Sequence, residues 1–409
     1  MFPRASSFYR PALALTSVSA IGVGSICLPA VQQPTAATIE VAAGPHARQN
    51  TIISFPIPGS RRGALYGLSA AGIVLPLQVQ DGTAWAVVPS LKAGDKTTYR
   101  LVELPDSPSD GVTVERGEED VRLESGGRLV LQYVGGMGAL PSTAVKPAFR
   151  RGGYLHPVRT PAGRIVTADY PPDHRHHHGV WFAWTRTAYQ GREPDFWNMG
   201  DGKGRVEFEA LDATWTGGVH GGLKARHRYV DLTSGTPVTV LREEWLTRVF
   251  HAPSGARHFL FDVEVRQTNV TDAPLLLPEY HYGGLAVRGA PDFVPPDHVS
   301  FLTSEGRDRT TGDGAPSRWA AMSGDIGGAR AGIAILAHPT NFRAPEPMRI
   351  HPTDPYMCYA PSRAGAWQIP AGGVHAARYR LVAFDGTPAL AELARLWRDY
   401  AEPPAVTVR

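Results

Sequence analysis

The fold class is indicated most clearly by two segments, TVLREEWLTRVF (239–250) and RHFLFDVEVRQTNVT (257–271). In an extended chain, successive side chains point to opposite faces, so both segments place charged residues on one face and branched or aromatic residues on the other. Similar strand-like runs follow one another from residue 112 onward, separated by turn residues such as Gly, Pro and Asp. Long consecutive strands with one solvent-exposed face predict a large antiparallel β-sandwich in an all-β protein.

The sequence predicts one further domain before this sandwich and a helix after it. Shorter alternating runs over 38–105 predict a small N-terminal β-domain, and the polar stretch DSPSDG (106–111) predicts a boundary before the main sandwich domain, 112–386. Residues 387–402 carry apolar side chains on one helical face, so we expect a C-terminal helix there, with Thr387 as its N-cap.

Composition narrows the function classes. The formal net charge is only +3, and no long run of Lys or Arg is present, so the sequence does not suggest a nucleic-acid partner. The high numbers of Gly (44) and Pro (36) are typical of many turns between strands.

The N-terminal segment predicts export. Arg4 and Arg10 precede an apolar, small-residue stretch that ends near Ala30, which is typical of a signal peptide. Residues 1–37 are therefore expected to be a signal peptide and linker, and the mature protein periplasmic or extracellular. The alternative is an uncleaved anchor helix; no later segment approaches the length of a membrane span.

The segment PPDHRHHHGVWFAW (171–184) holds four histidines within five positions, 174 to 178. It is predicted to be a loop that leads into a strand. If the extended conformation begins early, His174, His176 and His178 share one face and His177 points the other way. Neutral imidazoles suit zinc, copper or iron, and they are equally suited to proton transfer near neutral pH. The spacing leaves both chemistries open, with acid–base work preferred because no further ligand lies close in sequence.

Two further segments carry polar groups that could join this loop. In PEYHYGGLAVRG (278–289), Glu279 and His281 are two residues apart and would share a face of a strand, and Arg288 could hold an anionic or polyhydroxyl group. In the segment that begins at Asp195, a carboxylate, the flat face of Trp197 and an amide come together, a mixture that suits a sugar.

A fourth segment, 337–361, is rich in proline, so we expect an ordered loop without regular structure. It carries polar residues that could take part in a site: His338, Asn341, Arg343, Arg349, His351 and Asp354. Polar, titratable groups that gather in one concavity are typical of active sites, so the four segments are expected to line one cleft.

These segments, in this order and over roughly residues 40–386, resemble a bacterial family labelled methane oxygenase PmoA-like. Its members are typically exported. Arg175 and His178 occupy positions where the family often has Pro and Arg. The matching residues are Asp173, His174, His176, His177, Gly179, Val180 and Trp181 in the first motif, Asp195, Phe196 and Trp197 in the second, Gly283, Gly284, Leu285 and Arg288 in the third, and His338, Pro339, Asn341 and Arg343 in the fourth.

The activity in that label does not fit this chain. The methane monooxygenase subunit of that name crosses the membrane several times, whereas this sequence has no candidate span after its N-terminus. At fold level the strand pattern is similar to mutarotase-like sandwiches, which bind sugars on one concave sheet.

The sequence therefore predicts an exported enzyme (lyase, hydrolase or epimerase type) that acts on a carbohydrate or modified sugar, from a small molecule to an oligosaccharide, by histidine and carboxylate acid–base chemistry. The alternatives are a metal-dependent oxidoreductase or hydrolase with a divalent metal at the same histidines, or a non-catalytic sugar-binding protein. The residues expected to be catalytic are His174, His176, His177, Glu279 and His281. Those expected to bind substrate are Asp195, Trp197, Arg288, His338, Asn341, Arg343 and His351.

Overall fold

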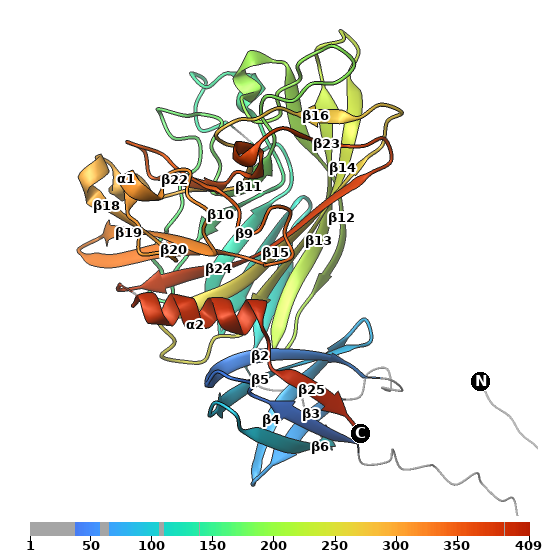
Figure 1. Cartoon of the computed structure of the whole chain (residues 1–409), viewed down its shortest axis with the longest axis vertical. Helices are drawn as coiled ribbons and strands as arrows, with labels where there is room; N and C mark the ends of the chain where they lie inside the picture. Colours follow the sequence, from blue (N-terminus) through green and yellow to red (C-terminus); the bar gives the residue numbers. More distant parts are fainter. Residues whose placement is uncertain (1–36, 58–64, 106–109, 139, 388) are drawn as a thin grey trace, which may run out of the picture. The chain divides into compact units, whose positions relative to one another are not determined.

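The computed structural model describes residues 37–57, 65–105, 110–138, 140–387 and 389–409. Their strands pair antiparallel in a seven-stranded sheet, two eight-stranded sheets and a small two-stranded sheet (Figure 1). The expected export signal falls on residues 1–36 and lies outside the described part of the chain. No helix in the described ranges is long and apolar enough to cross a membrane.

The seven-stranded sheet contains the six strands of residues 38–104 and one strand from the far end of the chain. β25 pairs with β1, with Ile39 opposite Val408, so the C-terminal residues complete this sheet. The sequence analysis missed β25 because it is four residues long and mostly exposed, and so lacks an apolar face. In spatial order the strands are β2 (Arg48–Pro56), β5 (Thr83–Leu91), β4 (Ile73–Gln80), β3 (Leu65–Ala70), β6 (Lys96–Leu104), β1 (Thr38–Ala42) and β25 (Ala405–Val408).

The first eight-stranded sheet, which we call the long sheet, contains the segments quoted first. In β14, Leu241, Trp245 and Val249 are buried while Arg242 and Glu244 are exposed, so the expected alternation is confirmed. In spatial order the strands are β12 (Gly204–Trp215), β13 (His220–Asp231), β14 (Val238–Phe250), β15 (His258–Asn269), β24 (Val374–Asp385), β20 (Ala329–Ala337), β19 (Trp319–Ile326) and β18 (Val299–Thr303).

The second eight-stranded sheet, which we call the site sheet, packs against the long sheet. Side chains of both sheets form one core cluster, for example Val180 and Phe182 from one and Trp245 and Phe261 from the other (Figure 1). The predicted antiparallel β-sandwich is thus confirmed. In spatial order the strands are β21 (Met348–Ile350), β22 (Tyr356–Tyr359), β17 (Gly284–Arg288), β11 (Val180–Ala183), β10 (Tyr154–Val158), β9 (Arg128–Val134), β8 (Asp120–Ser125) and β7 (Val112–Arg116).

The predicted C-terminal helix is confirmed as α2, Leu390–Ala401, but its start is not capped as expected. Ala389 is the N-cap residue and no side chain caps the helix, so Thr387 does not have the expected role. Leu393 and Leu396 pack on the long sheet. The remaining short elements are β16 (Leu275–Leu277) paired with β23 (Trp367–Ile369), α1 (Arg309–Gly312), and 3-10 turns at Pro147–Phe149, Met199–Asp201, Pro291–Phe293, Pro296–His298 and Pro361–Ala364.

Two local expectations were wrong. The proline-rich segment 337–361 contains β21 and β22, which pair with each other and extend the site sheet. Conversely, residues 278–283 are irregular, and β17 begins only at Gly284. Glu279 and His281 therefore do not share the face of a strand.

The core also holds a polar network. Glu243, which is fully buried on β14, accepts hydrogen bonds from His227 Nδ1 (2.8 Å), from the hydroxyl of Tyr229 (2.9 Å) and from Gln267 Nε2 (2.7 Å). His227 Nε2 in turn accepts from the hydroxyl of Tyr133 (2.7 Å), which lies on β9. Because a buried polar group is costly unless it is hydrogen-bonded, this network links the two sheets through mutually dependent side chains.

Candidate functional site

The candidate site lies on the face of the site sheet that points away from the long sheet. Along β11 and β22, alternate residues point to opposite faces, so Phe182 and Met357 enter the sandwich core while Trp181 and Tyr356 lie on the other face. The same alternation on β17 leaves Arg288 on this outer face, buried under the loops that cover it. The aromatic side chains form a rigid floor for the histidine loop.

The histidine loop folds into a tight turn. The backbone N–H of His177 donates to the carbonyl of His174 (2.9 Å). The turn gathers three imidazoles, with ring centroids 4.8 Å apart for His174 and His177 and 4.7 Å apart for His176 and His177. The expected extended arrangement is therefore wrong. His178 lies apart from this group, buried, with Nδ1 2.7 Å from Oδ1 of Asp169.

The gathered histidines line a pocket of about 170 Å³, which we call the histidine pocket. His281 and His351 reach it from segments more than 100 and 170 residues farther along the chain. Its lining residues are His174, His176, His177, Trp197, Asn198, His281, Tyr282, Arg349, His351 and Tyr356.

Two residues that were expected to bind substrate lie behind the pocket lining and hold other residues in place. Asp195 accepts hydrogen bonds from the backbone N–H groups of Trp197 and Asn198 (both 2.9 Å) and from the Asn198 side chain (2.8 Å). Asp195 thereby holds the pocket wall that carries Trp197. The side chain of Arg288 is only 2% exposed and is engaged by Asp173. Neither Asp195 nor Arg288 lines the pocket.

Four predicted residues lie elsewhere. Glu279 is exposed and does not line the pocket. His338 packs on the ring of Tyr400 (centroids 5.1 Å apart), and Arg343 donates to the carbonyls of Pro361 and Gly365. Asn341 donates to Glu346 (3.0 Å) and to the carbonyl of Arg378 (3.0 Å). His338, Asn341 and Arg343 therefore anchor loops, and the expectation that they share the cleft is wrong.

A chain of charged groups orients His174. Arg288 Nη2 donates to both carboxylate oxygens of Asp173 (3.0 and 2.7 Å). Burial raises the pKa of Asp173, but the hydrogen bonds from His174 and Arg288 outweigh this effect and lower it to about 2. The ionised carboxylate can only accept, so it receives the Nδ1–H of His174 at 3.1 Å. Nε2 is then the His174 nitrogen with a free lone pair.

A second carboxylate lies beside the same imidazole. Asp354 Oδ2 is 3.1 Å from His174 Nδ1 and 3.8 Å from Arg288 Nη1. The backbone N–H of Asp354 donates to Nδ1 of His351 (2.9 Å). His174, His351 and Asp354 also offer three possible metal-ligand atoms within 4.8 Å of one another.

The deeper histidines are neutral at physiological pH. Burial and the neighbouring His174 and His178 lower the pKa of His176 to about 4. Burial also lowers the pKa of His177 well below its usual range, with nearby His176, His174 and Arg288 adding to this effect. A general base works best when its pKa lies near the operating pH, so these two imidazoles are better suited to hydrogen bonding than to proton exchange.

Buried histidines also predict how stability depends on pH. Burial lowers the pKa of His220 to about 3 and that of His375 to about 4, against about 6.5 in the unfolded chain. The unfolded chain therefore binds more protons below pH 6.5, and we expect the free energy of unfolding to fall as the pH decreases from about 6.5 to about 4, by up to about 1.4 kcal/mol per pH unit for each group. Urea unfolding at pH 7 and pH 5 measures the effect. His375→Leu should reduce the slope, and equal stability at both pH values would contradict the expectation.

Several lining residues were not predicted as site residues. Tyr282 and Tyr356 line the pocket, as do Asn198 and Arg349, and Asp354 lies beside it. The last three belong to segments that were expected at the cleft, but they were given no individual role. The sequence did indicate Asn198, as the amide that follows Trp197, and the neighbourhood of His281 could have indicated Tyr282. Nothing local to the sequence places Arg349 or Asp354 next to the histidine loop, because strand pairing brings them there.

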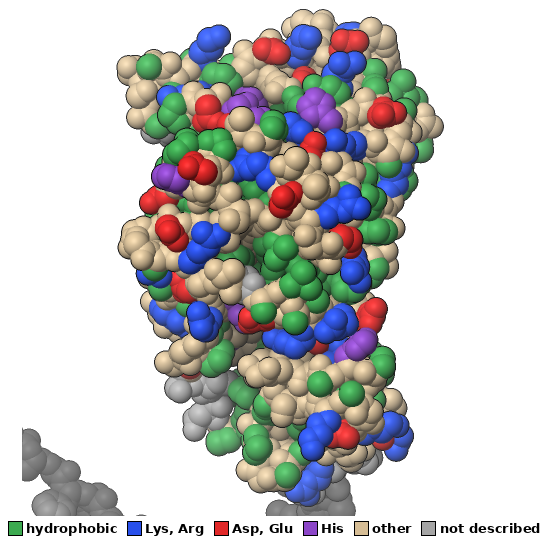
Figure 2. Space-filling model, turned by 60° about the vertical axis from the view of Figure 1, so that its left-hand side comes forward, with side chains coloured by type: hydrophobic (Ala, Val, Ile, Leu, Met, Phe, Trp, Pro, Cys, Tyr) green, Lys and Arg blue, Asp and Glu red, His purple; other side chains and the backbone are tan. Residues whose placement is uncertain are grey.

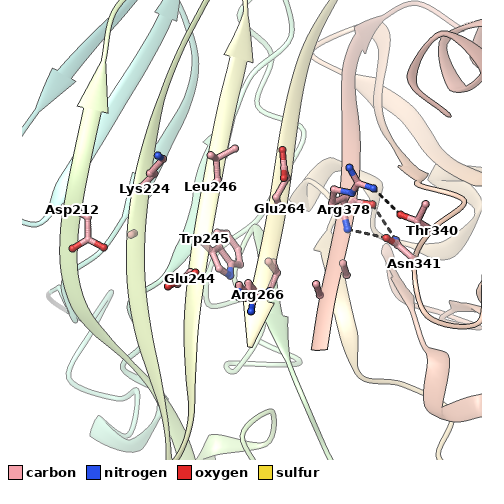
Figure 3. A pocket seen from close by; sticks show the side chains of 14 residues that line it. Asp212, Lys224, Glu244, Trp245, Leu246, Glu264, Arg266, Thr340, Asn341 and Arg378 are labelled. Carbon is pink, nitrogen blue, oxygen red and sulfur yellow. Dashed lines mark hydrogen bonds between the residues drawn. The ribbon is translucent and has the colours of Figure 1, made fainter. Parts of the chain in front are cut away.

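A larger hollow of about 640 Å³ lies on the outer face of the long sheet (Figure 3). Charged side chains of both signs line it, and several are paired, such as Lys224 with Asp81 (3.1 Å) and Glu264 with Arg248 (3.4 Å). No histidine lines this hollow within the described residues. Such a surface is typical of the solvated face of a sheet. Figure 2 shows another face of the molecule, on which histidine side chains lie among basic, acidic and hydrophobic ones.

Comparisons with known proteins give a family and distant structural similarities. The model of a family of unknown function, DUF6807, matches residues 120–398. No curated protein sequence matches the chain.

Two solved structures from Enterococcus faecalis, a protein in the glycosyl hydrolase family 38 and an alpha-mannosidase from strain V583, are each 8% identical with a TM-score of 0.38. They cover 92% and 91% of this chain, which spans 48% and 46% of theirs, about half their length. A TPR-domain containing protein from Parabacteroides distasonis ATCC 8503 is 10% identical over 84% of this chain and 57% of its own, with a TM-score of 0.27. No conclusion about function follows from these similarities.

Proposed function

The chain belongs to the DUF6807 family, whose function is unknown, and we propose that it is an enzyme that moves protons to or from a small carbohydrate or modified sugar in the histidine pocket. His174 is the general base in this proposal. The observation that carries it is the Arg288–Asp173–His174 chain of hydrogen bonds at the pocket.

The geometry suits His174 for this role. Its Nδ1–H is held by a carboxylate, which fixes the tautomer and leaves Nε2 to accept a proton. The carboxylates of Asp173 and Asp354 would then stabilise the imidazolium that forms. His176 and His177 stay neutral and can hydrogen-bond to substrate or to one another.

The lining supports a sugar as substrate. Trp197, Tyr282 and Tyr356 offer flat apolar faces, and Asn198 offers an amide that can bind hydroxyl groups. The volume of about 170 Å³ is smaller than the ~300–1,000 Å³ of typical ligand pockets, which favours a single sugar ring over a longer segment.

A second candidate is a metal-dependent enzyme, supported by the ligand atoms of His174, His351 and Asp354. These residues would hold a divalent cation, which would act as a Lewis acid. Two features favour the acid–base proposal. Arg288 already places a positive charge 3.8 Å from Asp354 Oδ2, and Nδ1 of His351 accepts a backbone hydrogen bond.

Export and the resemblance to the PmoA-like family stay predictions from the sequence. Export agrees with a sugar substrate that the cell meets outside the cytoplasm. The proposed enzyme would be of the lyase, hydrolase or epimerase type.

The test is an NMR assay of the full chain in D₂O with a panel of neutral hexoses, uronic acids and their methyl glycosides, before and after dialysis against a chelator. We expect C–H exchange or bond cleavage for at least one compound, unchanged by chelation. Activity that is lost on chelation and restored by zinc would support the metal-dependent candidate instead. Saturable binding without any chemical change would indicate a sugar-binding protein. If no compound of the panel is bound or converted, the carbohydrate proposal is contradicted.

A further inference from the structure

We infer that the histidine pocket takes a sugar acid and that Arg349 binds its carboxylate. This inference rests on the proposed function for the location of the pocket and deepens it by naming the substrate class. It makes no claim about the reaction.

Arg349 is built into the pocket wall. It lies on β21 between Met348 and Ile350, which both enter the sandwich core, so strand alternation directs Arg349 to the outer face. Its side chain is 14% exposed and lines the pocket together with His281 and His351.

The charge of Arg349 is only partly compensated. Asp313 Oδ2 accepts a hydrogen bond from Arg349 Nη1 (3.0 Å), but Arg363 binds both oxygens of the same carboxylate (2.9 and 3.1 Å). The backbone N–H of Ile350 donates to Asp313 as well (3.0 Å). Two guanidinium groups thus share one carboxylate, which leaves about one positive charge at this wall of the pocket.

Arg349 also has an unused donor. Its Nε–H is buried and has no hydrogen-bond partner within the described ranges of the chain. A buried donor without a partner destabilises the folded chain, and a ligand oxygen that reached this N–H would remove that penalty. Guanidinium groups bind planar carboxylates with two parallel hydrogen bonds, which makes a carboxylate the best-matched anion.

The two sides of the pocket differ in charge. Near His174, the guanidinium of Arg288 is paired with the carboxylate of Asp173 (2.7 Å) and lies 3.8 Å from that of Asp354, so its charge is compensated. The positive excess lies at the Arg349 wall. A sugar acid would therefore place its carboxylate at Arg349 and its neutral hydroxyl groups toward His174.

The experiment is isothermal titration of the full chain with D-glucuronate, D-galacturonate, D-mannuronate, L-guluronate and L-iduronate, each against the matching neutral hexose and against glucose 6-phosphate. We expect at least one uronate to bind 10-fold or more tightly than its hexose. Arg349→Gln should abolish this preference, Arg349→Lys should retain part of it, and Arg378→Gln, a change at an exposed arginine in the hollow of the long sheet, should retain all of it. Thermal unfolding checks that each variant is folded.

Each of the following results would overturn the inference: no uronate binds, a uronate preference survives in Arg349→Gln, or glucose 6-phosphate binds more tightly than every uronate. If Arg349→Gln does not fold, Arg349→Lys decides, because unchanged uronate affinity in that variant would also contradict a bidentate contact. Uronate binding without turnover would contradict the proposed enzyme but not this inference. Turnover of neutral sugars alone would do the reverse.

Discussion

Replacing His174 by alanine is expected to lower kcat by a factor of about 10²–10⁴, the usual contribution of a positioned general base. Stability should change little, because the side chain is 33% exposed and its polar partners are the carboxylates of Asp173 and Asp354. The measurement is kcat for the compound found in the NMR assay, together with urea unfolding of the variant.

Controls separate catalysis from structure. His298→Ala removes an exposed histidine outside the pocket lining and should leave kcat unchanged. Added imidazole should restore part of the activity of His174→Ala, since it replaces the lost base. A fully active His174→Ala variant would show that proton transfer does not pass through this residue.

Replacing Glu243 by alanine is expected to lower the free energy of unfolding by about 3–5 kcal/mol, the cost of removing one partner from a buried charged network. The change leaves His227, Tyr229 and Gln267 without their shared acceptor. It also removes a carboxyl group close to the buried Arg151 guanidinium, whose pKa is lowered by burial, an effect that Glu243 partly opposes. Urea unfolding near neutral pH measures the loss.

The neighbouring residue provides the matched control. Glu244 follows Glu243 on β14 but points to the solvent face, so Glu244→Ala should change stability by no more than about 0.5 kcal/mol. Equal effects of the two substitutions would mean that the buried network does not stabilise the sandwich.

The fold class could be predicted because strand alternation is a local property. Each residue of β14 and β15 faces either the core or the solvent, and that preference is visible in the segment itself. Even so, Glu243 shows the limit of the pattern. Its position between Leu241 and Trp245 puts it on the core face, but only the side chains of neighbouring strands supply the partners that make its burial tolerable.

The candidate site could be predicted in part because some of its signal is also local in the sequence. The density of histidines at 174–178 is a local signal, and His281, His351 and Trp197 do meet His174, His176 and His177 in one pocket. Which histidines meet depends on the turn at 174–177, which the alternation of an extended chain cannot reveal. The sequence also could not separate His351, which lines the pocket, from His338, which belongs to the same proline-rich segment and packs on Tyr400.

The β-sandwich, the C-terminal helix and the histidine loop can be predicted from the sequence alone, because hydrophobic alternation and residue density are properties of neighbouring residues. The rest of the site depends on how the strands are arranged in three dimensions. The pairing of β17 with β22, and of β22 with β21, brings Arg288, Asp354 and Arg349 to the histidine loop from more than 100 residues away. Such contacts depend on which strands become neighbours, and no pattern within a single strand specifies its neighbour.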